Sequence, residues 1–167
     1  MLDDCTDHTK DIIEEWINHG QKISASIIEV NVHSCGIARN AGLLKAQGNY
    51  VWFVDGDDWI ASPDAINIIL DYAYFTGAHY IQFEYGYPKT FQYHGHPAMV
   101  WQYVFKRDTL SNIRFTDIQP HEDLYFMQAY QAQYGKPAFL RDELYYYNYL
   151  REGSNVQQFL EKGRIDP

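Results

Sequence analysis

Residues 50–58 read Tyr50-Val51-Trp52-Phe53-Val54-Asp55-Gly56-Asp57-Asp58. The first five form a short, continuous apolar run, which is typical of a strand buried on both faces, as in a parallel sheet. Three carboxylates follow within four residues, so they lie where that strand ends. Sheets of this kind bind ligands beyond the carboxyl ends of their strands. The stretch therefore predicts a buried strand and a ligand site directly after it.

Helical and extended patterns alternate on both sides of this strand. Apolar residues recur at helical spacing in residues 9–19, 36–47, 62–76 and 121–134. β-Branched and aromatic residues favour strands at 23–32, 79–85 and 100–106, and residues 86–99 have the composition of a loop. Strands that alternate with helices predict a single α/β domain over residues 1–167, with a mostly parallel sheet flanked by helices.

The bulk composition excludes several classes of protein. With 167 residues, 46% of them hydrophobic, the chain is long enough for one packed domain. Its formal net charge of −9 argues against binding to nucleic acid or to an anionic membrane surface. No apolar run reaches the ~18 residues of a membrane span, and the N-terminus lacks the pattern of a signal peptide. We therefore expect a cytoplasmic protein, either free or peripheral to the membrane.

The chain is rich in tyrosine, with 15 tyrosines beside four tryptophans. A tyrosine ring offers a flat apolar face and a polar tip, which suits the apolar faces and hydroxyl edges of sugars. An aromatic core accounts for the same count, because tyrosine is often only partly buried. The composition leaves both interpretations open.

The carboxylates of Asp55, Asp57 and Asp58 repel one another unless a cation or hydrogen-bond donors compensate their charge. Carboxylate oxygens are hard ligands that suit Mg2+ or Mn2+, and such an ion can bridge to a diphosphate. An acidic turn in which Asp58 caps the next helix is the plainer alternative. A phosphatase with an aspartyl-phosphate intermediate is disfavoured, because such enzymes need Thr or Val where this chain has Trp59.

Segments spread along the chain resemble, in order, the motifs of the family 2 glycosyltransferases. Those from Leu2 to Thr9, Cys35 to Leu43 and Tyr50 to Asp58 are similar to V-D-D-G-S-x-D-x-T, G-x-A-R-N-x-G and Y-x-x-F-x-D-x-D-D. Those from Ile113 to Phe115, His121 to Phe126 and Leu144 to Arg151 are similar to I-R-F, E-D-x-x-F and a closing L-Y-x-Y. The resemblance implies the GT-A fold of the nucleotide-diphospho-sugar transferases.

The resemblance also implies a donor site. By motif position, Asp3 and Asp4 would face the nucleotide base and ribose, and Arg39 would lie near the base and the diphosphate. Asp55 would hold the ribose, directly or through a metal, and Asp57 would bind a Mn2+ or Mg2+ ion on the diphosphate. The plainer alternatives are that Asp3 and Asp4 are acids before a helix, and that Arg39 pairs with a surface carboxylate.

The same resemblance implies the chemistry. Asp123 would be the general base that takes the proton of the acceptor hydroxyl, with Glu122 beside it as the substitute. Both could instead be first-turn acids favoured by the helix dipole. The implied activity is an inverting transfer from a nucleotide-diphosphate sugar, with a UDP-sugar as the expected donor, to a saccharide or lipid-linked acceptor in surface polysaccharide or glycan synthesis. The alternative is an inactive or incomplete nucleotide-sugar-binding module of the same fold.

One departure from the family pattern concerns the start of the sequence. Family members begin with a strand, a loop and a helix before the Asp-Asp segment, whereas this sequence opens on that segment. We therefore expect the sheet to lack its usual first strand and to leave an edge or an apolar face that needs a cover. A second copy of the chain, in a homo-oligomer, is one way to cover it.

Overall fold

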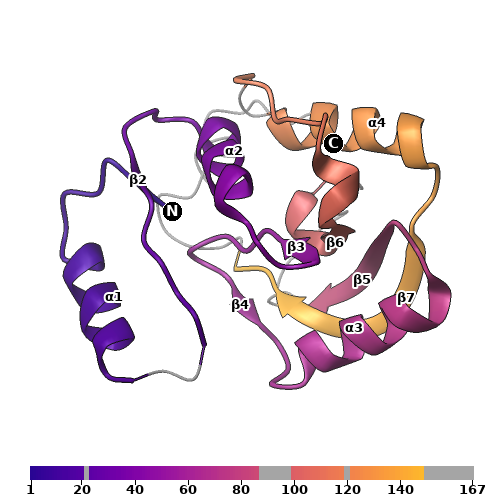
Figure 1. Cartoon of the computed structure of the whole chain (residues 1–167), viewed down its shortest axis with the longest axis horizontal. Coiled ribbons are helices and arrows are strands. Elements are labelled where there is room, and N and C mark those ends of the chain that lie inside the picture. The colour runs from indigo at the N-terminus through magenta and orange to yellow at the C-terminus, as the bar shows by residue number, and fades with distance from the viewer. Residues whose placement is uncertain (21–22, 87–98, 119–120, 149–167) are drawn as a thin grey trace.

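The structure is a computed structural model that describes residues 1–20, 23–86, 99–118 and 121–148. The helices in Figure 1 are α1 (Thr9–Asn18), α2 (Cys35–Lys45), α3 (Ala65–Thr76) and α4 (Glu122–Tyr134). The strands are β1 (Leu2–Asp3), β2 (Glu29–Val30), β3 (Tyr50–Trp52), β4 (Trp59–Ile60), β5 (Tyr80–Gly86), β6 (Tyr103–Lys106) and β7 (Ala138–Tyr146). All four predicted helices are confirmed, with ends shifted by a few residues. Most of the predicted loop at 86–99 lies outside the described residues.

The central sheet has five strands in the order β3-β6-β5-β7-β4. Strands β3, β5 and β7 run in one direction, and β6 and β4 run in the other. The prediction of an α/β domain is confirmed, whereas the mostly parallel sheet is confirmed only in part, since β5–β7 is the parallel pair of this sheet. Two neighbouring strands can run parallel only if a crossover, usually a helix, connects them. In the connection between β5 and β6, residues 87–99 have no helical pattern. Strand β6 therefore returns antiparallel between β3 and β5.

Strand β3 differs from the strand predicted at 50–54. It lies at one end of the sheet order and pairs with β6 through the register Val51↔Phe105. Its three residues are half-buried, and the fully buried side chain of this stretch is Phe53, just after the strand. The prediction of burial on both faces is wrong, because an open groove between this strand and α3 leaves Tyr50 and Trp52 only partly covered. The strand predicted at 23–32 shrinks to β2, and residues 100–102 form a 3-10 turn before β6.

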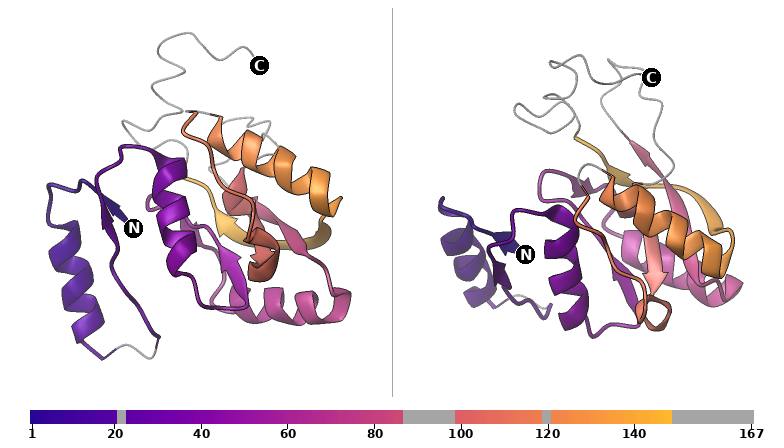
Figure 2. Two further views of the ribbon diagram at one scale, coloured as in Figure 1. Left: turned by 45° about the horizontal axis from the view of Figure 1, so that its top comes forward. Right: turned by 90° about the horizontal axis from the view of Figure 1, so that it is seen from above.

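Helices cover both faces of the sheet, as the two views in Figure 2 show. On one face, α3 packs Ile69 and Ala73 against sheet residues such as Ile81. On the other, α4 packs Phe126 and Tyr130 against the opposite sheet face, and α2 lies beside α4. Tyr80, Tyr103, Tyr130 and Tyr145 are almost completely buried. An aromatic core therefore accounts for part of the tyrosine content.

The N-terminal elements stand to one side of this core (Figure 1). Strands β1 and β2 form a small parallel sheet of their own, and α1 buries none of its residues. Ile12 is 65% exposed and Trp16 is 44% exposed on that helix. Apolar side chains of α1 are therefore open to solvent, and the cover of an exposed edge or face by a second copy of the chain stays a prediction. None of the helices in the described residues is both long and apolar enough to span a membrane.

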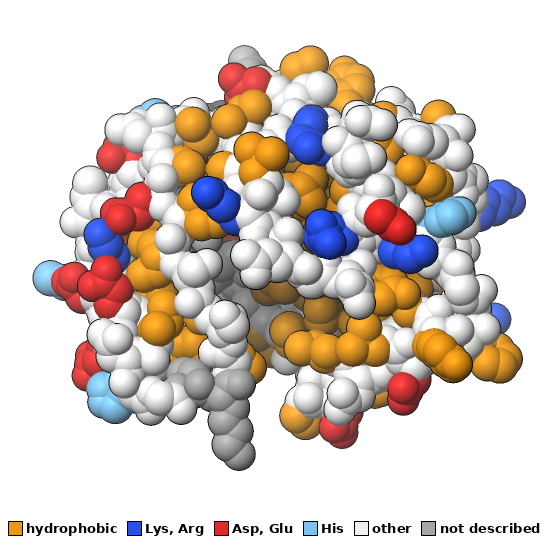
Figure 3. All heavy atoms as spheres, viewed as in Figure 1, with side chains coloured by type: hydrophobic (Ala, Val, Ile, Leu, Met, Phe, Trp, Pro, Cys, Tyr) orange, Lys and Arg blue, Asp and Glu red, His pale blue; other side chains and the backbone are white. Residues whose placement is uncertain are grey.

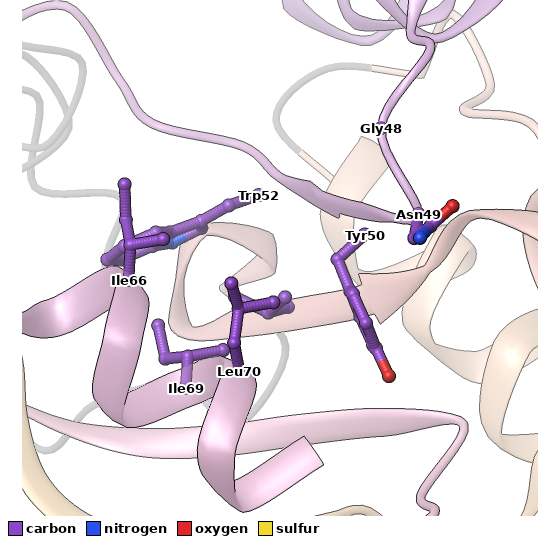
Figure 4. Close-up of a pocket in the computed structure, with 8 residues that line it drawn as sticks. Gly48, Asn49, Tyr50, Trp52, Ile66, Ile69 and Leu70 are labelled. Atoms are coloured by element: carbon purple, nitrogen blue, oxygen red, sulfur yellow. The ribbon is translucent and has the colours of Figure 1, made fainter. Parts of the chain in front are cut away.

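An apolar groove of about 420 Å³ lies between β3 and α3. Figure 4 shows Trp52, Ile66 and Leu70 turned toward it from the strand and the helix. Figure 3 shows that apolar side chains also gather on the surface around α3. None of the described residues that line the groove carries a charged side chain. The acidic residues predicted to act on a substrate therefore lie elsewhere.

Candidate functional site

Arg39 lies at the centre of a group of acidic side chains from two distant parts of the chain. Its Nη1 donates to Asp123 Oδ1 at 2.7 Å and to Glu122 Oε1 at 3.5 Å. Its Nη2 donates to Asp55 Oδ1 at 2.9 Å. The Arg39 side chain is only 15% exposed, so these are shielded ion pairs rather than surface ones. We refer to Arg39, Asp55, Glu122 and Asp123 as the arginine cluster.

Helix α2 presents Arg39 to the cluster. Ser34 begins the helix, and its hydroxyl accepts a hydrogen bond from the Ile37 N–H. At Gly36, a Cβ atom would lie 2.6 Å from the Thr116 carbonyl oxygen and 3.2 Å from the Glu122 Cβ. Only glycine permits that approach. The close contact brings the first turn of α2 against the start of α4, so Arg39 reaches the acids there.

The neighbouring Asn40 fixes the same helix to a second motif. Its Nδ2 donates to the Phe115 carbonyl at 2.9 Å, and its Oδ1 accepts from the Phe115 N–H at 3.0 Å. The guanidinium carbon of Arg39 lies 5.6 Å from the centre of the Phe115 ring, within the range of a cation–π contact. The segments 35–43 and 113–115 are therefore locked together next to the arginine cluster.

Asp123 lies in the first turn of α4 with both carboxylate oxygens engaged. Oδ1 accepts from Arg39, and Oδ2 accepts from the Val100 N–H at 3.0 Å. Burial raises the pKa of Asp123 to about 6, although Arg39 and the Val100 N–H both oppose the shift. The carboxylate is consequently ionised at neutral pH and has a pKa suited to accepting a proton.

Glu122, which precedes Asp123, has fewer hydrogen-bond partners for its carboxylate than Asp123 has. Its Oε1 contacts Arg39, whereas Oε2 is buried and has no hydrogen-bond partner among the described residues. Leaving a buried carboxylate oxygen unpaired is unfavourable. A ligand hydroxyl or a cation at this position would satisfy it, which marks the cluster as a place where a ligand can bind.

The 55–58 turn is held by the end of β7. The Tyr145 hydroxyl accepts from the Asp55 N–H at 3.1 Å and donates to Asp58 Oδ2 at 2.7 Å. Asp58 Oδ1 accepts from the Asn148 N–H at 2.8 Å, and the Asn148 amide donates to the Asp57 carbonyl at 3.3 Å. Asp58 therefore supports the turn rather than capping α3. Burial raises the pKa of Asp58 to about 6, against the two donors.

The carboxylates of the 55–58 turn could hold a divalent ion only if a bound substrate supplied further ligands to it. Asp55 and Asp57 offer the hard oxygens that Mg2+ and Mn2+ prefer. The described residues contain no group of three His, Cys, Asp or Glu side chains that could hold a metal ion by themselves. Mg2+ is commonly bound by one or two carboxylates together with substrate phosphates. The donor set suits that second arrangement.

Asp3 and Asp4 are not part of the arginine cluster. The Asp3 carboxylate accepts hydrogen bonds from the N–H groups of Val32, His33 and Ser34 at 2.8, 3.1 and 3.1 Å. These bonds lower the pKa of Asp3, the Val32 N–H most strongly, and they order the loop that leads into α2. Asp4 has a left-handed backbone with φ of 51° and lies 3.7 Å from His33 Nε2. Their predicted contact with a nucleotide stays a prediction.

Several groups that shape the site were not singled out from the sequence. Tyr145 and Asn148 belong to the closing L-Y-x-Y segment, so the motif carried a signal for them without indicating their partners. Val100 contributes its main-chain N–H, a group that nearly every residue has, so the sequence gives no signal for this contact. Only the packing of the 3-10 turn against α4 brings the N–H to Asp123. A single sequence does not show which residue a buried hydroxyl or amide group will hydrogen-bond.

Comparisons with known proteins agree with this architecture. The family model described as glycosyl transferase family 2 matches residues 1–134. The curated poly(ribitol-phosphate) beta-N-acetylglucosaminyltransferase TarS of Staphylococcus aureus is 28% identical over 181 residues, which covers 93% of this chain and 30% of that protein. This chain is thus similar to about a third of that relative's length.

Solved structures share the fold. A crystal structure of S. aureus TarS in complex with UDP-GlcNAc superposes with a TM-score of 0.76 at 21% identity, covering 93% of this chain and 50% of that one. The mannosyltransferase PcManGT from Pyrobaculum calidifontis, in complex with GDP-Man and Mn2+, gives a TM-score of 0.71 at 14% identity, covering 98% and 54%. These likenesses confirm the GT-A fold expected from the sequence motifs.

Proposed function

The chain belongs to glycosyl transferase family 2, and on that premise we propose that it takes part in transferring a sugar from a nucleotide-diphosphate donor to an acceptor hydroxyl, with inversion at the anomeric carbon. The arginine cluster carries this proposal. It brings Asp55, at the end of the strand that leads to the metal motif, and Asp123, the expected base, to the same guanidinium. Residues of three separate motifs meet there, as a donor site next to a general base requires.

Asp123 is the group that we assign to proton transfer. Its carboxylate would take the proton of the acceptor hydroxyl while that oxygen attacks the anomeric carbon. The bond from the anomeric carbon to the diphosphate breaks with its electron pair, which leaves with the nucleoside diphosphate. Attack from the face opposite the leaving group inverts the configuration. Arg39 and the Val100 N–H hold the carboxylate in place and keep it charged at neutral pH.

Arg39 has a second task in this proposal. Its guanidinium is the one cation whose ion pairs join the acids of the cluster in the described residues. A planar fork of donors matches phosphate as well as carboxylate. When a donor diphosphate arrives, Arg39 can give up part of its contact with Asp55 to the phosphate oxygens. That exchange would orient the leaving group while the Asp123 contact persists.

Asp57, with Asp55, would hold a Mn2+ or Mg2+ ion on the donor diphosphate. Such an ion supplies positive charge that neutralises the departing diphosphate. Asn148 and Tyr145 fix the turn from which both carboxylates project. Because the protein ligands alone are too few, we expect the ion to bind tightly only in the presence of the nucleotide.

The names of the similar proteins suggest which substrates to try first. TarS is a poly(ribitol-phosphate) beta-N-acetylglucosaminyltransferase, and one of its crystal structures holds UDP-GlcNAc. We therefore propose a UDP-sugar donor, with UDP-N-acetylglucosamine as the first candidate, and an acceptor in surface polysaccharide synthesis. Asp3 and Asp4 would contact the uridine.

A titration of UDP into the protein, with and without Mn2+, tests the donor site directly. The proposal expects binding that strengthens when Mn2+ is present, followed by UDP release from UDP-N-acetylglucosamine only when an acceptor is added. Absence of UDP binding in both conditions would contradict the donor site. Binding without turnover across a panel of donors and acceptors would contradict transfer while leaving the nucleotide site intact.

A further inference from the structure

An aromatic pair, formed by an exposed tryptophan and a half-buried tyrosine, lies beside the site and has no part in the scheme above. The indole ring of Trp59 stacks on the phenol ring of Tyr146, with ring centres 4.3 Å apart and planes inclined by 10°. The two residues face each other across the antiparallel β4–β7 pair. Trp59 is nevertheless 50% exposed. One side of the indole is therefore backed by Tyr146, and a large apolar surface remains open to solvent.

The pair is tied to the proposed donor site by the chain itself. Trp59 directly follows Asp58 and comes two residues after Asp57. A residue spans at most about 3.6 Å of chain, so the Cα atoms of Asp57 and Trp59 lie within about 7 Å of each other. On the opposite strand, Tyr146 follows Tyr145, whose hydroxyl holds the 55–58 turn. The aromatic pair and the acidic turn thus share one support.

We propose that Trp59, backed by Tyr146, is the stacking platform for a ring-form sugar of the acceptor. This inference rests on the proposed function, because it assigns the acceptor side of the same site. A pyranose has a flat face of C–H groups, and an indole face offers matching apolar area. Tyr146 fixes the indole plane before the sugar arrives, so little side-chain entropy is lost on binding. Hydroxyl groups at the sugar edge can then reach toward the carboxylates of the 55–58 turn.

Charge argues for the same class of acceptor. Among the described residues, Arg39 is the cation paired within the cluster, and Asp55, Glu122 and Asp123 already engage it. An acceptor built of alditol phosphates has no ring face to stack, and its phosphates would meet three carboxylates that share a single cation. A neutral glycan with pyranose rings suits both the platform and the charge. The site therefore favours a ring-form saccharide over a polymer such as poly(ribitol phosphate).

Nuclear magnetic resonance can test this without turnover. The 167-residue chain contains four tryptophans, hence four indole N–H signals, and the Trp59→Phe variant assigns the one of interest. We expect this signal to shift when methyl pyranosides and pyranose disaccharides are titrated in the presence of UDP and Mn2+. The Trp16 signal, from an indole of similar exposure on α1, should stay in place. If UDP binds but no saccharide in the panel moves the Trp59 signal, the platform is wrong although the donor site stands.

Steady-state kinetics provide the second test. Trp59→Ala should raise the KM for the saccharide acceptor about fivefold to tenfold, with the KM for the UDP-sugar unchanged, and Trp59→Phe should restore most of the loss. Trp16→Ala is the matched control and should alter neither constant. A rise in the donor KM instead would place Trp59 in the donor site and overturn the inference. So would faster transfer to a ribitol-phosphate oligomer than to any pyranoside.

Discussion

Nη1 of Arg39 lies 2.7 Å from Oδ1 of Asp123, although the two residues are 84 positions apart in the sequence. The same guanidinium reaches Asp55 through its other terminal nitrogen. The contact places a fixed positive charge between the proposed base and the turn that would hold the donor. It also makes the stability of the site and its proton chemistry depend on one side chain.

Replacement of Arg39 by glutamine should destabilise the protein. The change leaves Asp55 and Asp123 without their main counter-charge in a shielded site, and breaking a buried ion pair commonly costs about 3 kcal/mol or more. Urea unfolding followed by circular dichroism would measure the loss. Arg141→Gln, at an exposed position on β7, is the matched control and should change the free energy of unfolding by less than about 0.5 kcal/mol. Equal effects of the two substitutions would contradict the cluster.

Replacement of Asp123 by asparagine should slow sugar transfer about a hundredfold or more, as expected when a general base is lost. Binding of UDP should be retained, because Asp123 contacts the acceptor and not the donor in the proposed scheme. Asp71→Asn, on the exposed side of α3, serves as the control. Turnover that survives in the Asp123 variant would transfer the role of base to Glu122, which Glu122→Gln would then test.

The rate of transfer should depend on pH through Asp123. Its carboxylate must be ionised to accept a proton, and its pKa is raised to about 6 by burial. We therefore expect kcat/KM to fall as the pH is lowered through about 6 and to level off above it. A profile that stays flat down to pH 5 would exclude Asp123 as the titrating base.

Stability should move in the opposite direction over the same range. The unfolded chain releases the Asp123 proton near the ordinary value of 3.8, whereas the folded protein keeps it up to about 6. The folded state thus binds more protons in this window, so this group lowers the free energy of unfolding as the pH rises from about 4 to about 6. Asp58 adds an effect of the same sign. In Asp123→Asn the dependence should weaken, as denaturation at several pH values would show.

Replacement of Asp57 by asparagine should abolish the gain in UDP affinity that Mn2+ provides. The substitution removes the charge of one of two carboxylates available to the ion, and a neutral amide is a poorer ligand for it. Calorimetric titration with and without Mn2+ measures the effect. Asp64→Asn, exposed just before α3, is the control. Metal-dependent binding equal to that of the parent would show that the ion is held elsewhere.

Replacement of Tyr145 by phenylalanine should loosen the 55–58 turn. The hydroxyl that is lost accepts from the Asp55 N–H and donates to the Asp58 carboxylate. Loss of both bonds should lower the free energy of unfolding by about 2 kcal/mol and weaken UDP binding. Tyr74→Phe, at a residue 92% exposed on α3, should alter neither quantity. A Tyr145 variant with normal stability would mean that Asn148 alone suffices to hold the turn.

Local patterns in the sequence were enough to place the helices. The spacing of Ile66, Ile69, Leu70 and Ala73 predicts α3, and Gly77, with φ of 62°, ends it. Helical periodicity depends on residues only three and four positions apart, so it can be recognised without knowledge of the fold. The prediction of strands was less accurate, because a strand forms only when a partner strand pairs with it. The strand expected at 23–32, for example, is limited to Glu29–Val30.

The sequence by itself determined which residues are candidates for the chemistry. Recognisable patterns of residue types marked these candidates: the Asp-Gly-Asp-Asp turn after an apolar run, Arg39 in its motif and the acidic pair at 122–123. The tertiary structure alone decided which of them meet. Arg39 joins Asp55 and Asp123, whereas Asp3 turns to the backbone of residues 32–34. Motifs record local chemistry, but an ion pair between residues 84 positions apart forms only when the packing of α2 against α4 brings the two side chains together.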